Sequence, residues 1–218
     1  MLCTTGLAAE AKIARRAGFS AVVGAGDRRR TVKVVEEAAS AVECLVSFGI
    51  AGALKPGLRA GDIILSTEVV DEDKRWLTSD GLRPRLAELA AEIGAIEGPV
   101  LGAQMAVATK ADKRRAWKET GAIAVDLESA VVARAAAALG IPFVVLRAIA
   151  DPAARELPPA ALVPLADDGT PAIAQVLASV LARPRQLPTL LTVAREARQA
   201  LQALIGPAQA LNRVLAGA

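Results

Sequence analysis

Histidine is absent from this chain of 218 residues, and so is tyrosine. Without histidine the chain cannot form a serine–histidine catalytic pair or a histidine-ligated metal centre, so we expect no metal. Aromatic residues make up only 2% of the sequence. Because few rings are present to stack on unpaired bases, nucleic acid is not an expected partner.

Cysteine and long apolar runs are also scarce. The two cysteines, Cys3 and Cys44, lie in short apolar runs predicted to be strands, which favours buried free thiols over a disulfide or a metal pair. Although 53% of the residues are hydrophobic, no uncharged run approaches the roughly 20 residues that cross a bilayer. Glu10 and Lys12 interrupt the first apolar stretch, so we expect no signal peptide and a cytoplasmic protein.

Positive charge is concentrated near the end of the chain. The net charge is +3, yet the part from Arg183 onward holds five arginines and one acid, a net charge of +4, which leaves −1 for the rest. We therefore divide the chain into an α/β domain of residues 1–182 and a helical extension of residues 183–218. The extension is expected to pack on the same domain or on a partner subunit.

The most informative stretch spans residues 122–153. An apolar run to Val125 leads into an acidic turn with Glu128, an alanine-rich helix follows, and a second β-branched run ends at Asp151. This order predicts a parallel βαβ unit. Both carboxylates then lie at the carboxyl ends of strands, where open α/β sheets bind ligands. The alternative is that Glu128 stabilises a helix N-terminus and Asp151 a turn.

The rest of the chain fits the same architecture. Further strands are predicted at residues 2–5, 21–23, 43–48 and 99–107, and further helices at residues 7–17, 82–93 and 110–120. The fold class is therefore α/β, a single domain with a central, mixed but mostly parallel twisted sheet flanked by helices, and with extra C-terminal helices.

Three other segments supply candidate site residues at the same edge of the sheet. Glu10 follows the first strand, in the first turn of a helix, where an acid is also common for the helix dipole alone. The turn with Gly24, Gly26 and Arg28 precedes a helix and suits an anion such as phosphate, although its arginines equally suit a solvated helix start. The segment of residues 49–52 is small enough for close approach of a ligand.

Two motifs, Val-Asp-Leu-Glu-Ser at residues 125–129 and Leu-Arg-Ala-Ile-Ala-Asp at residues 146–151, resemble the paired signature of the purine nucleoside phosphorylase and nucleosidase superfamily. The resemblance implies a nucleoside phosphorylase-like fold and a homo-oligomer. It also implies catalytic roles: Glu128 holds ribose hydroxyls, Asp151 serves the purine leaving group, and Glu10 positions the attacking water. The implied substrate pocket comprises Gly49, Ile50, Ala51, Gly52, Met105, Val107, Asp126 and Leu127.

A narrower resemblance rests on the segments Thr-Gly-Leu-Ala-Ala-Glu-Ala at residues 5–11, Asp-Pro-Ala at residues 151–153 and Leu-Pro-Pro-Ala-Ala-Leu at residues 157–162. These resemble the hopanoid-associated phosphorylases, which implies removal of adenine from adenosylhopane, an adenosyl lipid. No cofactor is expected, and either water or phosphate is the nucleophile. The alternatives are a 5'-methylthioadenosine/S-adenosylhomocysteine nucleosidase and a non-catalytic scaffold at a membrane surface.

The basic extension suggests how a lipid substrate is reached. One helical stripe carries Leu190, Ala194, Ala197, Leu201 and Leu204, and the arginines of this region are Arg183, Arg185, Arg195, Arg198 and Arg213. This pattern predicts peripheral contact with the inner membrane face. The alternative is that the stripe packs on the protein itself.

Overall fold

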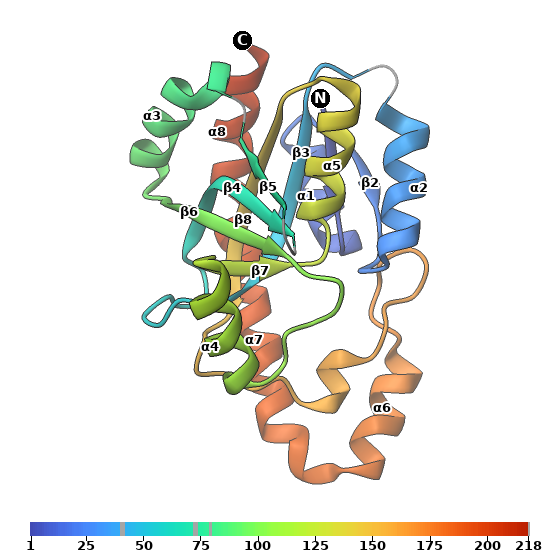
Figure 1. The fold of residues 1–218 in the computed structure, drawn as a ribbon. Helices are drawn as coiled ribbons and strands as arrows, with labels where there is room; N and C mark the ends of the chain where they lie inside the picture. Colours follow the sequence, from blue (N-terminus) through green and yellow to red (C-terminus); the bar gives the residue numbers. More distant parts are fainter. Residues whose placement is uncertain (40–41, 72–73, 79, 218) are drawn as a thin grey trace.

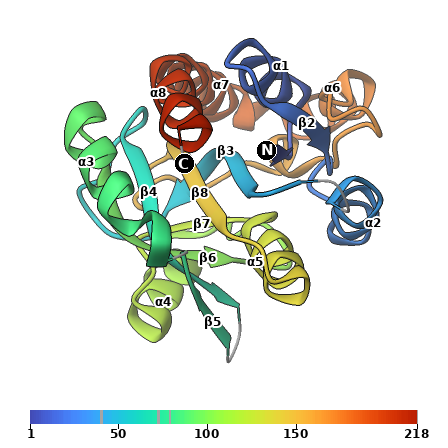
Figure 2. The ribbon, with the colours of Figure 1, turned by 90° about the horizontal axis from the view of Figure 1, so that it is seen from above.

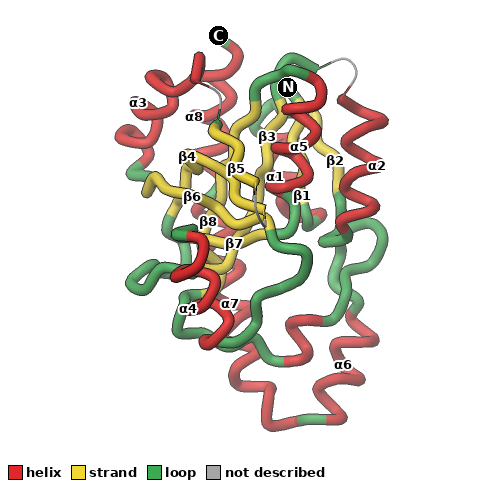
Figure 3. The backbone as a smooth tube through the Cα atoms, in the orientation of Figure 1, coloured by secondary structure: helices red, strands yellow, loops and turns green. Residues whose placement is uncertain are grey.

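A computed structural model describes residues 1–39, 42–71, 74–78 and 80–217. The strands lie in the middle of the molecule and the helices surround them (Figures 1 and 3). The strands are β1 (Leu2–Thr5), β2 (Ser20–Val23), β3 (Leu45–Ala53), β4 (Ile63–Asp71), β5 (Lys74–Leu77), β6 (Ile96–Gly102), β7 (Ala124–Asp126) and β8 (Phe143–Asp151).

The α-helices of the described residues are α1 (Ala8–Arg16), α2 (Arg28–Ala39), α3 (Arg83–Ile93), α4 (Lys110–Thr120), α5 (Ser129–Leu139), α6 (Ile173–Ala182), α7 (Leu187–Ala203) and α8 (Ile205–Ala216). Short 3-10 turns lie at Asp80–Leu82, Pro159–Leu162 and Pro184–Gln186. The mixed α/β architecture predicted from the sequence is confirmed.

Five of the strands form a closed circuit. β3 pairs in parallel with β8, β8 antiparallel with β4, β4 in parallel with β6, β6 in parallel with β7, and β7 antiparallel with β3. The register shifts between Ala51 and Gly52 and again between Ser66 and Val69, which lets the long strands β3 and β4 bend. β1 and β2 extend the sheet from β3, and β5 extends it from β4.

Helices cover the strands on two sides. α1, α7 and α8 lie on one side, and α2 and α5 lie on the other (Figure 2). Along β8, Val144 and Leu146 belong to the core on the first side, while Phe143 and Val145 belong to the core on the second. Successive side chains point to opposite faces of a strand, so burial on both faces explains the continuous apolar run in the sequence.

The prediction of a parallel βαβ unit over residues 122–153 is wrong in one respect. The helix between the two strands is present as α5, but β7 is antiparallel to β3 whereas β8 is parallel to it. The two strands therefore run in opposite directions. Sequence periodicity detects the strands, but it carries no information on their direction once the sheet closes on itself.

Two strand boundaries also differ from those expected. The strand expected at residues 43–48 instead begins at Leu45 and continues to Ala53, so the segment of residues 49–52 belongs to β3. The strand expected at residues 99–107 instead begins at Ile96 and ends at Gly102, so Met105 and Val107 lie in the loop before α4. The small residues of β3 remain extended because β8 and β7 supply hydrogen-bonding partners on its edges.

The two C-terminal helices pack on the α/β core. α7 lies against β8 and β3, and α8 lies against α3 and α1. Ala200, Leu204 and Leu211 are fully buried there. Of the apolar stripe predicted for membrane contact, Leu204 thus belongs to the core, while Ala194 is exposed. No helix in the described part of the chain combines the length and the apolar character needed to cross a membrane.

Candidate active site

Three carboxylates from distant parts of the chain line one cavity of about 780 Å³. Glu10 comes from the first turn of α1, Glu128 from the N-terminal boundary of α5, and Asp151 from the end of β8. All three are buried, with exposed fractions of 2%, 5% and 9%. The structure thus brings these three predicted residues together in the wall of one cavity.

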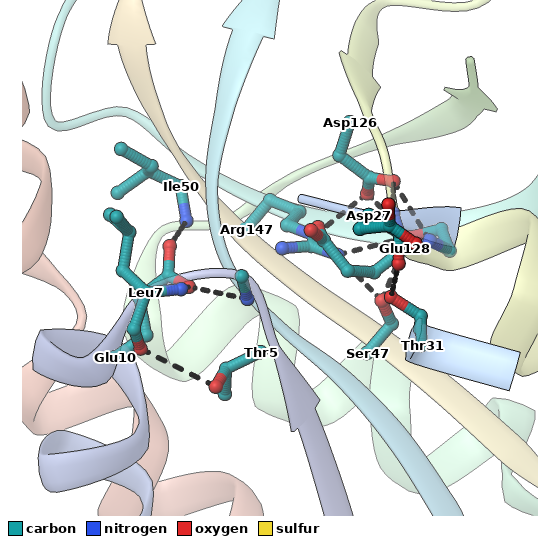
Figure 4. A network of polar contacts seen from close by, with 12 residues as sticks. Thr5, Leu7, Glu10, Asp27, Thr31, Ser47, Ile50, Asp126, Glu128 and Arg147 are labelled. Carbon is teal, nitrogen blue, oxygen red and sulfur yellow. Dashed lines mark hydrogen bonds and ion pairs between the residues drawn. The ribbon is translucent and has the colours of Figure 1, made fainter. Parts of the chain in front are cut away.

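Arg147 is the buried cation at the centre of this arrangement. Its side chain is completely inaccessible and forms ion pairs with Asp126, at 2.7 Å from Nε, and with Glu128, at 3.4 Å from Nη2. Nη2 also donates to Ser47 Oγ at 2.6 Å. In Figure 4 the guanidinium lies between Glu10 on one side and Asp126 and Glu128 on the other. One cation thus serves three buried carboxylates.

Glu10 is held by the backbone. Its Oε2 accepts from the N–H groups of Gly6 and Leu7, at 2.9 and 2.8 Å, and its Oε1 accepts from the N–H of Ile50 at 2.7 Å (Figure 4). Burial raises the pKa of Glu10, against the effects of Arg147 and of these three donors. A Cβ at Gly49 would lie 2.4 Å from Oε1, so glycine is required there for the carboxylate to approach β3.

Glu128 is the carboxylate of the cluster whose pKa is raised to near neutrality. Burial raises its pKa to about 7, Arg147 opposes the rise, and the charges of Asp126 and Glu10 add to it. The side chain of Glu128 also lies close to the backbone of Gly6, because a Cβ at Gly6 would lie 2.7 Å from Glu128 Oε1. A carboxylate that changes ionisation near neutrality is therefore fixed within the cavity wall.

Asp126 has a structural use that the sequence did not predict. It lines the cavity, but its Oδ1 accepts from the N–H groups of Glu128 and Ser129, at 3.1 and 2.8 Å, at the start of α5. Its Oδ2 pairs with Arg147 and accepts from the Ser129 hydroxyl. The carboxylate thus caps a helix and neutralises a buried cation, in addition to lining the cavity.

Asp151 is paired with a second buried cation. The ammonium of Lys113, on α4, donates to Asp151 Oδ2 and also to the carbonyl oxygens of Pro152 and Arg155, at 3.2 and 3.0 Å. Burial raises the pKa of Asp151, while the charge and hydrogen bond of Lys113 act in the opposite direction. The nearby charges of Glu196, which raises that pKa, and Arg155, which lowers it, have smaller effects.

The expected substrate pocket is largely assembled. Seven of the eight predicted binding residues line the cavity: Asp126, described above, and Ile50, Ala51, Gly52, Met105, Val107 and Leu127. Gly49 does not line the cavity and packs against the carboxylate of Glu10. A wall that was not assigned to the pocket is added by the proline-rich segment, through Leu157, Ala161, Leu162, Val163, Pro164 and Leu165. This wall is apolar throughout.

Only part of the candidate phosphate turn lines the cavity. Gly26 and Arg30 line the cavity, whereas Gly24 and Arg28 do not. Gly24 packs under Thr31, and Arg28 forms an ion pair of 3.0 Å with the buried Asp71. Arg28 therefore ties α2 to β4, and Arg30 replaces it as the arginine that faces the site. The guanidinium of Arg30 pairs with Asp167 at 2.8 Å.

Arg147 and Lys113 were not singled out from the sequence. Arg147 stands inside the motif of residues 146–151 and interrupts an otherwise apolar strand, a signal for a buried, paired charge. Lys113 carried no such signal, because it is one of several basic residues on a helix that looks solvated. Only the packing of α4 against the end of β8 reveals that this lysine is buried.

Comparison with known proteins identifies a family. Residues 23–183 match the model of the phosphorylase superfamily. Similar solved structures include the 5'-methylthioadenosine/S-adenosylhomocysteine nucleosidase of Helicobacter pylori, with 16% identity, a TM-score of 0.71, and coverage of 100% of this chain and 98% of that one. The futalosine hydrolase of the same organism has 16% identity, a TM-score of 0.72, and coverage of 100% and 97%. At such low identities these similarities establish the fold.

Proposed function

This chain belongs to the phosphorylase superfamily and is an enzyme of the nucleoside phosphorylase or nucleosidase type, and we propose that it cleaves the N-glycosidic bond of an adenosyl compound with a large apolar 5'-substituent. The observation that carries the proposal is the meeting of Glu10, Glu128 and Asp151 in one cavity. Two carboxylates on either side of a glycosidic bond perform the equivalent chemistry on oxygen glycosides.

Each carboxylate has a role that its surroundings support. Cleavage develops positive charge on the ribose and negative charge on the departing purine. The ribose therefore needs a nearby negative charge, and the purine needs a proton donor. Asp151, whose pKa is raised by burial, holds a proton for a ring nitrogen of the purine. Glu128 accepts from the ribose hydroxyls, and its negative charge stabilises the ribosyl cation.

Water is the nucleophile that the geometry supports best. A carboxylate has about four lone-pair sites, so Glu10 can still accept from a water molecule after binding three backbone N–H groups. Arg147 already forms ion pairs with Asp126 and Glu128, so its charge is engaged by the protein rather than available to a phosphate dianion. Arg28 and Arg30 are already paired with aspartates. We therefore favour hydrolysis over phosphorolysis.

The apolar wall carries the proposal for the 5'-substituent. Residues 157–165 border the cavity with leucine, valine, proline and alanine side chains, and Met105 adds a further apolar group. A polar amino-acid substituent, as in S-adenosylhomocysteine, would leave its charges unpaired against such a wall. Adenosylhopane, whose substituent is a hydrocarbon, is the substrate that we propose. Methylthioadenosine remains the second candidate, because its substituent is small but also apolar.

Product analysis tests this function. Purified protein is incubated with adenosylhopane in detergent, with methylthioadenosine and with S-adenosylhomocysteine, each with and without phosphate. Adenine release from adenosylhopane at the highest kcat/KM, independent of phosphate, is the expected result. Faster turnover of methylthioadenosine would make methylthioadenosine the substrate in place of adenosylhopane. A rate that depends on phosphate would make phosphate the nucleophile in place of water. Absence of adenine from all three would favour the non-catalytic scaffold.

A surface next to the cavity suggests how a lipid substrate is collected. We propose that the exposed apolar face of α6 and the start of α7, defined by Ile173, Leu177, Leu181, Leu187 and Leu191, contacts an anionic membrane. These side chains are 43–82% exposed. Ile173, Leu177 and Leu181 are spaced by four residues and so share one face of α6. This face lies at the end of the molecule opposite both termini (Figure 1).

Charge supports an anionic surface as the occupant. Arg183 and Arg185 are exposed between α6 and α7, and Arg195 and Arg198 are exposed further along α7. Each is worth about 1 kcal/mol near anionic lipid. Arg213 does not contribute, because it pairs with Glu92 at 3.1 Å on the far side of the molecule. The membrane contact predicted for the stripe of α7 is therefore moved to α6.

Flotation with vesicles tests the membrane contact. The protein should float with anionic vesicles, less so as salt rises, and the double substitution Leu177→Ser and Leu181→Ser should abolish flotation. Leu77→Ser is the matched control, because Leu77 is 63% exposed on β5, away from α6. A protein that stays in solution at low salt and forms a dimer disrupted by the double substitution would assign the face to a second copy instead.

A further inference from the structure

Lys113 is fully buried, and nothing in the proposed mechanism so far uses it. Its side chain is 1% exposed, although it stands on a helix whose neighbouring lysines and arginines face solvent. Burying an ammonium is costly unless every donor finds an acceptor. Here the three hydrogens have three oxygen acceptors, on Asp151, Pro152 and Arg155.

The three acceptors identify what Lys113 holds. All of them belong to the end of β8 or to the turn that follows it, so one ammonium fastens both the Asp151 side chain and the backbone just beyond it. Lys113 contacts Oδ2, and no hydrogen bond to Oδ1 is present among the described residues. Oδ1 is therefore the oxygen left for a ligand in the cavity that Asp151 lines.

We propose that Lys113 is a positioning residue for the leaving group, which orients Asp151 toward the purine and stabilises the carboxylate formed when Asp151 gives up its proton. This inference rests on the proposed N-glycosidic cleavage. In the step, the bonding electrons of the C–N bond pass to the purine, and the proton on Asp151 passes to a purine nitrogen. Asp151 is left as a carboxylate beside the ammonium, and charge and atoms balance without another reactant.

Two opposed effects on one acid explain why such a partner is needed. Burial alone would keep the proton on Asp151 too firmly for rapid transfer, whereas a cation in contact favours the ionised product. Arg147 does not take this role for Asp151, because its ion pairs are with Asp126 and Glu128 and its Nη2 donates to Ser47. The leaving-group end of the cavity thus has its own cation, supplied from a different helix.

The test uses two leaving groups on the same protein. One substrate is a 5'-alkylthioadenosine, whose purine must be protonated as it leaves, and the other is the matching 4-nitrophenyl riboside, whose phenolate leaves without a proton. Lys113→Met should lower kcat on the adenosine by about 10²–10⁴-fold, the usual contribution of acid catalysis. On the nitrophenyl riboside the change should be no more than about threefold. Lys113→Arg, which keeps a cation, should recover part of the loss.

Controls separate this inference from the proposed function and from misfolding. Lys110→Met is the matched control, since Lys110 is exposed on the same helix and should leave both rates unchanged. Where Lys113→Met lowers the melting temperature below the assay temperature, Lys113→Gln is measured in its place. An equal loss on both substrates, or no loss on either, overturns the role of Lys113 alone. A wild-type protein that cleaves no adenosyl substrate overturns the proposed function and this inference together.

Discussion

The two cations buried beside the cavity have very different surroundings. Arg147 lies among three carboxylates, those of Glu10, Asp126 and Glu128. Lys113 faces a single carboxylate and two neutral carbonyl groups. The first arrangement suits a substrate part that becomes positive, and the second suits a part that takes up a proton. Under the proposed function, this difference assigns the ribose to the Arg147 end of the cavity and the purine to the Lys113 end.

Removing the cation from the more crowded cluster should have the largest effect. Arg147→Met leaves three buried carboxylates without their counter-ion, so the free energy of unfolding should fall by about 3–5 kcal/mol. Chemical denaturation measures it. Arg134→Met is the control, because Arg134 is a half-exposed arginine that shares Asp71 with Arg28. A loss below about 1 kcal/mol for Arg147→Met would mean that the cluster does not need its cation.

At the other end of the cavity, Asp151→Asn should abolish most of the activity while the fold survives. The amide keeps the shape and an acceptor for Lys113 but has no acidic proton, so adenine release should fall by about 10²–10⁴-fold. Melting temperature and kcat are measured together. Asp168→Asn, a change at an exposed aspartate, provides the comparison. Near-normal turnover in a folded Asp151→Asn protein would remove Asp151 from the mechanism.

The pH dependence of kcat/KM distinguishes the two ends further. Glu128 must be ionised to accept from both ribose hydroxyls, and its pKa is raised to about 7 by burial. Activity should therefore rise with pH through neutrality, and fall about tenfold for each unit below that pKa. Glu128→Gln should lower the rate and remove this acidic limb. A limb that persists in Glu128→Gln would assign the titration to another group, with Glu10 the next candidate.

The smallest effects are expected at the glycine-rich turn. Arg28→Ala breaks the pair with Asp71, which keeps Arg134, so stability should fall by about 1 kcal/mol with no change in rate. Arg30→Ala removes the arginine that lines the cavity. If water is the nucleophile, neither substitution alters the response to phosphate. A phosphate KM that rises in Arg30→Ala alone would instead make phosphate the co-substrate.

Much of the site was predictable because the relevant residues stand next to strong local signals. Glu128 follows a strand and starts an alanine-rich helix, and Asp151 ends a β-branched run before a proline. The secondary structure around both was therefore expected correctly. The partners of these residues were not, because Lys113 looks like any exposed lysine in the sequence, and the buried Asp71 that binds Arg28 is far away in the chain.

The sequence by itself predicted most of the strands and helices and the carboxylates that line the cavity, since apolar periodicity, turn residues and motif spacing are local properties. Tertiary structure alone decided how they meet. β7 and β8 run in opposite directions, so their carboxyl ends would lie far apart if both paired with β3 along its whole length. The short β7 instead pairs only with the end of β3, and this register brings both carboxyl ends to Gly52, which pairs with Val125 on one side and with Asp151 on the other. Long-range pairing of bent strands is not encoded in any one segment, so the sequence predicted that Glu128 and Asp151 share one site but not the strand directions and buried cations that hold them there.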